Sequence, residues 1–170
     1  MAKKKSSNLG KLLVLLSIVL GVVALVMLIA PGFSPNSDAD KFGADGVALY
    51  KVVFGNSERK LAFSFPLFLG VLLIAAGVVC SVLALLGKGG KIVSLVAAIC
   101  FIAGGVLYFC TMSVYAVDVG DLSGNLKDLA VKAAKEAISA VYNLGIGAII
   151  GGILSILAGV AVITPIFLKK

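Results

Sequence analysis

The chain contains no histidine and no tryptophan, and its three cysteines all fall within long apolar stretches. Without histidine, the usual proton shuttle, the common haem ligand and many metal sites are excluded. There is no Cys-x-x-Cys pair, and the polar segments hold no cysteine for a disulfide, which argues against a thiol oxidoreductase. We therefore expect no cofactor and no bound metal ion.

Charge is missing from four apolar stretches, at residues 12–30, about 66–86, 92–117 and 144–168. At a rise of about 1.5 Å per residue, each helix would be long enough to cross a hydrocarbon core of about 30 Å. Hydrophobic residues make up 61% of the 170 residues and charged residues 14%, unlike a soluble domain. The sequence predicts an all-α membrane protein, one domain built as an antiparallel bundle of four transmembrane helices.

None of the four stretches contains an acidic or basic residue, whereas ion- and proton-coupled carriers keep such a group within their spans. No serine, threonine or cysteine has a recognisable base partner for nucleophilic catalysis. We therefore expect a protein that is not an enzyme. Enzymatic chemistry would have to come from an external Asp cluster or from the lysine-rich segment 118–143.

The Asp cluster consists of Asp38, Asp40 and Asp45 in a glycine-containing turn. It departs from the EF-hand pattern, because Leu49 stands where that loop needs its last carboxylate. A solvated turn and an irregular site for a divalent cation both stay open.

Acidic residues are confined to two segments, because all eight lie in residues 31–65 and 118–143. The other flanks, residues 1–11, 87–91 and 169–170, hold eight lysines and no acid. By the positive-inside rule, both termini and the 87–91 turn face the cytoplasm, and the two acidic segments lie outside. We expect a multi-pass protein of a plasma membrane, which we take to be bacterial. The net charge of +7 belongs to the cytoplasmic side, so it does not indicate a nucleic-acid partner.

Four lysines precede the first stretch, namely Lys3, Lys4, Lys5 and Lys11. Near an anionic leaflet each would gain about 1 kcal/mol from contact with lipid. A purely topogenic role, without specific lipid recognition, is the simpler alternative. Because residues 12–30 are longer than the roughly 7–15 residues of a signal-peptide core, we interpret them as a retained signal anchor.

The two external segments predict different structures. Residues 47–54 are rich in β-branched and aromatic side chains, residues 55–57 supply turn chemistry, and residues 59–65 alternate, which favours a short β-hairpin. From about Asn125 the second segment has charged side chains on one half of a helical wheel and leucine and alanine on the other. This pattern predicts an external amphipathic helix whose alanine-rich face favours protein contact over lipid.

The last stretch carries small residues on one helical face, spaced by four, with a second row beside them: Gly147, Gly151, Ser155, Gly159, Ala148 and Gly152. Small side chains at this spacing let helix backbones approach closely in a membrane. We expect a helix-packing interface here. Packing within the four-helix bundle and packing between protomers both fit the pattern.

In layout the chain resembles the claudin-type four-span proteins. Both have cytoplasmic ends, a longer first external segment with strands, a short inner turn and a smaller second external segment. The external tryptophan and paired cysteines of that family have no counterpart in this sequence. The resemblance is therefore one of topology, and it transfers no residue, no partner and no barrier function.

Association is the function that these observations favour. We expect helix–helix and external-loop contacts that make the chain a small subunit of a membrane complex or a self-assembling structural protein. Its partners would be the lipid bilayer, further copies and other membrane proteins. The alternative is a pore or carrier subunit for an uncharged or passively moving solute, lined by groups such as Ser94, Thr111, Ser113 and Thr164.

Overall fold

The computed structural model describes residues 2–37, 45–120 and 122–168. Four long helices form its body: α1 (Ala2–Val26), α4 (Phe65–Leu85), α5 (Gly90–Phe109) and α8 (Ile146–Leu168). A 3₁₀ turn, η1 (Met27–Ile29), extends α1. All four are long and apolar enough to cross a membrane. The prediction of a multi-pass membrane protein with four helical spans is thus confirmed.

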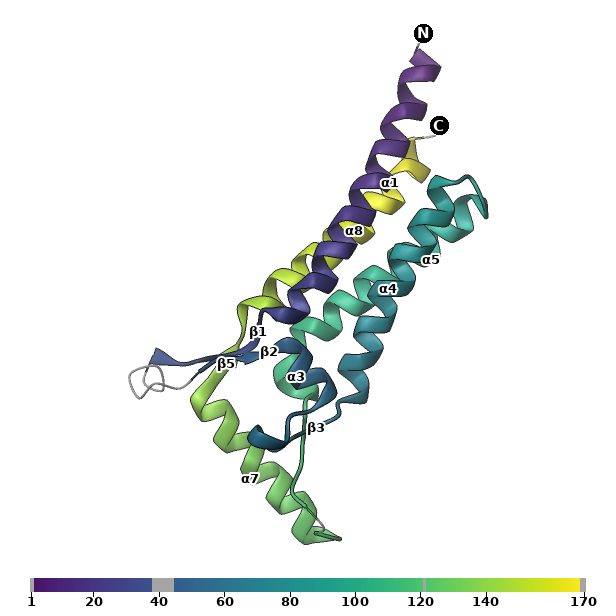
Figure 1. Ribbon diagram of the computed structural model, residues 1–170. Helices are drawn as coiled ribbons and strands as arrows, with labels where there is room; N and C mark the ends of the chain where they lie inside the picture. The colour runs from purple at the N-terminus through teal and green to yellow at the C-terminus, as the bar shows by residue number, and fades with distance from the viewer. Residues whose placement is uncertain (1, 38–44, 121, 169–170) are drawn as a thin grey trace.

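The four helices form a closed ring in which each packs against two neighbours. α1 packs on α4, α4 on α5, α5 on α8, and α8 on α1. Residues 86–89 join α4 to α5, and Gly87 and Gly89 make this turn with positive φ angles of 75° and 86°. Both chain termini lie at the same end as this turn, which we call the termini end (Figure 1). We call the opposite end the sheet end.

The third span is shorter than predicted. Helix α5 ends at Phe109 and is followed by the short helix α6 (Thr111–Val114) and the strand β4 (Ala116–Val117), whereas the sequence predicted one span from 92 to 117. Tyr115, which follows α6, is almost completely buried against protein. Apolar residues after Phe109 thus pack inside the protein, which hydropathy alone does not distinguish from burial in lipid.

Two small antiparallel sheets cover the sheet end. Strand β1 (Pro31–Pro35) lies between β2 (Val47–Ala48) and β5 (Tyr142–Leu144), and β3 (Leu61–Ala62) pairs with β4. The register places Phe33 opposite Leu144 and Val47. Segments far apart in the chain, the end of the first span and the start of the last, are therefore joined by backbone hydrogen bonds.

The predicted hairpin of residues 47–54 with 59–65 is wrong in its pairing. Residues 49–54 form helix α3 (Leu49–Phe54), and the 3₁₀ helix η2 (Ser57–Arg59) follows. Leu49, Val52 and Val53 are fully buried at helical spacing, so burial selects the helix over the β preference of these side chains.

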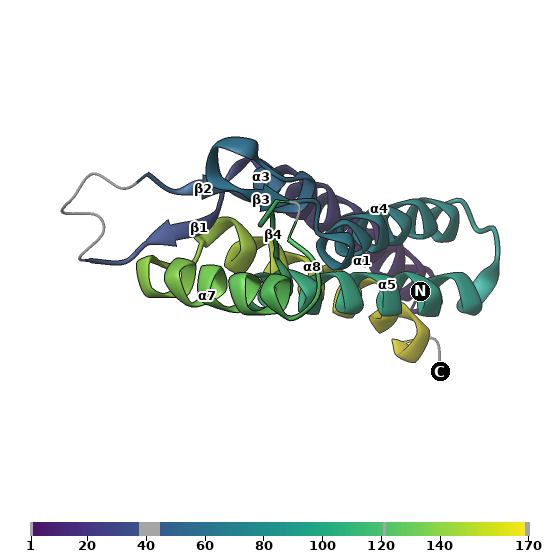
Figure 2. The same ribbon diagram turned by 90° about the horizontal axis from the view of Figure 1, so that it is seen from below.

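The predicted amphipathic helix is present as α7 (Asn125–Val141). It begins after Gly124, whose φ of 63° reverses the chain, rather than after a side-chain cap. Figure 1 shows α7 as the element farthest from the spanning helices. Seen from below, α7 and α3 lie on opposite sides of the small strands (Figure 2).

Phe101 occupies the centre of the ring of helices. The ring of this α5 residue is fully buried, and a Cβ added at Gly21 of α1 would lie 2.6 Å from it. A Cβ added at Gly77 of α4 would lie 2.9 Å from the same ring, and one at Gly159 of α8 would lie 3.3 Å from the Phe101 Cβ. Glycine on three helices therefore makes room for one aromatic side chain on the fourth.

Candidate interaction site

The small residues predicted on α8 lie at buried helix contacts inside the ring. A Cβ added at Gly147 would meet the carbonyl oxygen of Ala30 at 2.8 Å, so α8 approaches backbone there. One added at Gly151 would lie 2.9 Å from the ring of Tyr108 on α5. One added at Gly159 would meet backbone of α5 at 3.1 Å. The row spaced by four thus contacts α5 and the end of the first span.

The six small residues predicted on α8 are called the α8 ridge, and its remaining members make equally close contacts. The Ser155 hydroxyl donates a hydrogen bond of 2.7 Å to the carbonyl oxygen of Phe101. Gly152 faces Gly105, and a Cβ on either residue would come within 3.1 Å of the other's carbonyl oxygen. Ala148 is fully buried. Because these six residues are all buried within one chain, this face is already occupied and is not available to a second protomer.

Replacing Gly151 by leucine tests this packing. We expect a loss of about 1–3 kcal/mol in stability, because the added side chain must displace the Tyr108 ring. Thermal unfolding in detergent measures the loss. Ile153→Leu is the matched control, since Ile153 is exposed on the same helix. Equal melting temperatures for the two variants would contradict the close contact.

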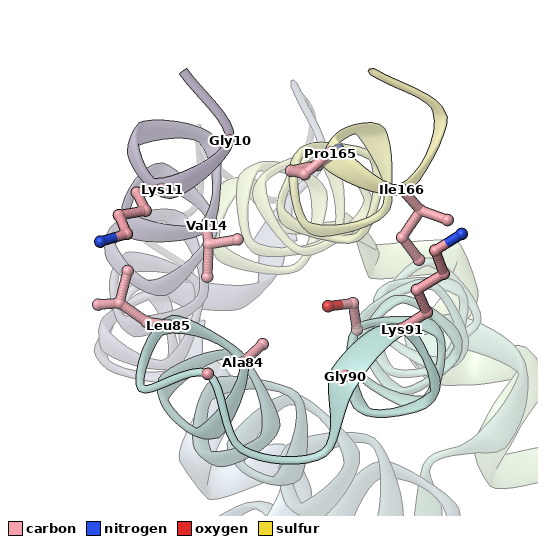
Figure 3. A pocket seen from close by; sticks show the side chains of 11 residues that line it. Gly10, Lys11, Val14, Ala84, Leu85, Gly90, Lys91, Pro165 and Ile166 are labelled. Carbon is pink, nitrogen blue, oxygen red and sulfur yellow. The ribbon is translucent and has the colours of Figure 1, made fainter. Parts of the chain in front are cut away.

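A cavity of about 290 Å³ opens at the termini end, where all four spanning helices line it (Figure 3). Val14 and Ala84 contribute apolar surface, and Ser94 contributes a hydroxyl. Lys11 and Lys91 lie on opposite sides of the opening, and their nitrogen atoms point away from each other. The arrangement does not bring the two charges together around one small ligand.

The lysines at this end have no acidic neighbours in sequence, because residues 1–37, 66–117 and 144–170 contain no acid. No acid within these ranges can therefore neutralise them. Of the four lysines predicted to contact anionic lipid, Lys11 is on the cavity rim. The other three, Lys3, Lys4 and Lys5, lie in the first turns of α1, and their side chains are outside the described part.

The hydroxyl groups considered for a pore are not brought together. Ser94 lines the cavity at the termini end. Thr111 is buried at the sheet end, and its hydroxyl donates a hydrogen bond of 2.5 Å to the carbonyl oxygen of Tyr108. The Thr164 hydroxyl likewise donates within α8, at 2.7 Å. Ser113 follows α5, beyond its last residue. With Phe101 between the two ends, these groups do not form one polar path.

Helix α7 is fastened to the rest of the sheet end by Tyr115. The Tyr115 hydroxyl donates a hydrogen bond of 3.2 Å to the carbonyl oxygen of Lys135, and the Lys135 ammonium lies 5.2 Å from the centre of the Tyr115 ring. Phe33 of β1 meets the same ring edge-on at 5.1 Å. Burial raises the pKa of Tyr115, which extends the pH range over which its hydroxyl can donate this bond. A further bond of 2.5 Å runs from Arg59 to the hydroxyl of Tyr142.

The leucines of α7 face away from this attachment. Leu126 and Leu129 are 67% and 68% exposed, the largest values among the leucines described. Ile138, by contrast, packs against the core. At about 3.6 residues per turn, the exposed Leu126, Leu129, Ala133 and Ala137 share one stripe, roughly 135° around the helix from Ile138. We call this stripe the leucine face.

The chain offers no metal-binding cluster within its described residues, where no three His, Cys, Asp or Glu side chains gather. Two members of the predicted Asp turn, Asp38 and Asp40, lie outside the described residues. The third, Asp45, is exposed.

Comparison with protein-family models, curated proteins and solved structures finds no match to this chain. Its own structure therefore defines its class: a small protein with four membrane-spanning helices and a folded layer of short strands and helices at one end.

Proposed function

We propose that this protein is not an enzyme and acts by association, as a small subunit of a membrane complex. The four spans hold it in the bilayer, and the leucine face of α7 binds the external part of another membrane protein. A second copy of this chain is the competing occupant of the same face.

The observation that carries the proposal is the exposure of Leu126 and Leu129 on a helix outside the spans. Contiguous apolar surface on a water-exposed element is typical of protein interfaces. The face is otherwise alanine, so a partner helix or strand could approach its backbone closely. The ridge on α8, the other apolar feature predicted to associate, is used inside the bundle.

The orientation of the chain belongs to the same proposal. All eight acids lie in residues 31–65 and 118–143, the segments between spans whose described residues form the sheet end, and residues 1–11, 87–91 and 169–170 carry eight lysines and no acid. The positive-inside rule therefore places both termini and the 86–89 turn in the cytoplasm and α7 outside a plasma membrane, in our view a bacterial one. Lysine accessibility to a membrane-impermeant reagent in intact cells would test this orientation.

The test of the proposed function is the assembly that each variant forms. We expect Leu126→Ser combined with Leu129→Ser to weaken partner binding by about 2 kcal/mol or more, roughly thirtyfold in Kd, without lowering the melting temperature. The protein would be extracted in lipid nanodiscs, the assembly weighed, and bound proteins identified by mass spectrometry.

Lys127→Ser combined with Lys132→Ser is the matched control, because it changes two exposed residues of the same helix outside the leucine face. This control should keep the partner. A wild-type assembly that is a bare monomer, or one whose mass both double variants leave unchanged, would contradict the proposal. A homo-oligomer lost only with the leucines would assign the face to a second copy.

A further inference from the structure

Four phenylalanines gather where α3 meets the beginning of α4, and we call them the aromatic corner: Phe54, Phe63, Phe65 and Phe68. The ring centres of Phe54 and Phe63 lie 5.9 Å and 5.4 Å from that of Phe68, so these three rings form one cluster, and Phe65 begins α4 beside it in sequence. Phe54 and Phe63 are half exposed, and Phe65 is 65% exposed. Phenylalanine has no polar group to hydrogen-bond with water, so this surface needs a cover.

The aromatic corner continues the surface of α4 that faces away from the bundle. Along α4 the exposed large side chains follow Phe65 on one face, at Leu69, Leu72, Val79, Leu83 and Leu86. In a membrane-embedded helix, this stripe is surface that lipid would cover. Phe65 is the first residue of α4, and the other rings of the corner extend the stripe past the end of the span.

The position and charge of the corner fit the boundary between hydrocarbon and headgroups. Figure 1 shows α3 lying against the ends of the spanning helices, whereas α7 lies farther out. Interfacial helices bury phenylalanine and leucine side chains at this depth, about 5–10 Å into the boundary between headgroups and acyl chains. The neighbouring residues Lys51, Arg59 and Lys60 outnumber the one acid, Glu58, and long basic side chains near helix ends reach the lipid phosphates of either leaflet.

We infer that the aromatic corner is embedded in the headgroup region of the leaflet at the sheet end, and that α3 is an interfacial helix lying on the membrane. Lipid is thus the occupant of this surface. The corner then fixes the depth of α4 and holds one side of the folded layer on the bilayer. Because α7 lies farther from the spanning helices than α3 does, its leucine face stays in water (Figure 1). The inference does not depend on what α7 binds.

The absence of tryptophan makes the test direct, because any tryptophan introduced is the sole one in the chain. Phe63→Trp places the probe in the corner, and Phe54→Trp is a second variant should the first fail to fold. Leu72→Trp, on the exposed stripe of α4, marks the hydrocarbon, and Leu126→Trp marks the water-exposed leucine face. Each variant is reconstituted alone in liposomes whose lipids carry bromine near the headgroup or deep in the acyl chains.

We expect the Phe63→Trp fluorescence to be lost mainly to lipid brominated near the headgroup and to be protected from aqueous iodide. Leu72→Trp should respond most to deep bromine, and Leu126→Trp to iodide alone. Iodide quenching of Phe63→Trp without bromolipid quenching would overturn the inference, since the corner would then face water. Bromolipid quenching that appears only when protein is diluted in lipid would also overturn it and assign the corner to a second copy.

Discussion

Replacing Phe101 by alanine is expected to lower the free energy of unfolding of the bundle by about 3 kcal/mol. The ring lies against Gly21 of α1 and Gly77 of α4, and the Phe101 Cβ lies near Gly159 of α8; these glycines have no side chains to fill the space that the ring would leave. Equilibrium unfolding in mixed detergent micelles measures the change. Phe167→Ala removes the same ring from a site that is 71% exposed, so it should change stability far less.

A second substitution shows whether the glycines act through Phe101. Gly77→Ala alone should destabilise, because its methyl group would lie 2.9 Å from the Phe101 ring. In a chain that already carries Phe101→Leu, the same methyl group has more room. The double mutant is therefore expected to be about 1 kcal/mol more stable than the sum of the two single losses would give. Additive losses would mean that Gly77 serves some contact other than the central ring.

The four spans were predictable because length and missing charge decide them locally. A helix in lipid must satisfy all its backbone groups itself, so any uncharged apolar run of sufficient length gives the same signal. Hydropathy does not distinguish an apolar segment surrounded by lipid from one buried against protein. Tyr115 shows this limit, since hydropathy places it within the third span, whereas the structure buries it against α7 and β1.

The sheet end was predicted less well because its contacts join distant residues. β1 pairs with β5 across more than a hundred residues of sequence, and no local pattern encodes that register. Spacing did identify the α8 ridge, since one helix carries all six residues. The space that glycines leave for the Phe101 side chain could not be predicted in this way, because those glycines lie on three other helices. The aromatic corner was missed for a similar reason: its rings come from α3, α4 and the segment between β3 and α4.

Adding a single methyl group at Gly145 is expected to detach the folded layer from the bundle. A Cβ at this position would lie 2.2 Å from the carbonyl oxygen of Pro31 and 2.6 Å from the carbonyl carbon of Gly32. Both are backbone atoms, so no side-chain rotation relieves the overlap. Gly145 also donates a backbone hydrogen bond of 2.7 Å to Gly32, and its carbonyl oxygen accepts the first hydrogen bonds of α8. Moving β5 away from β1 would break this junction.

We therefore expect Gly145→Ala to destabilise the protein by about 3 kcal/mol and to expose segments 31–65 and 118–144 to protease, while the helical content of the spans is retained. Limited proteolysis in nanodiscs, with circular dichroism on the same samples, separates these two effects. Gly10→Ala is the control, because its methyl group would meet only an ordinary contact at 3.5 Å. If Gly145→Ala resisted protease as well as the control did, the β1–β5 junction could not be what holds the layer to the spans. Loss of the spans together with the layer would instead show that the bundle needs the junction to fold.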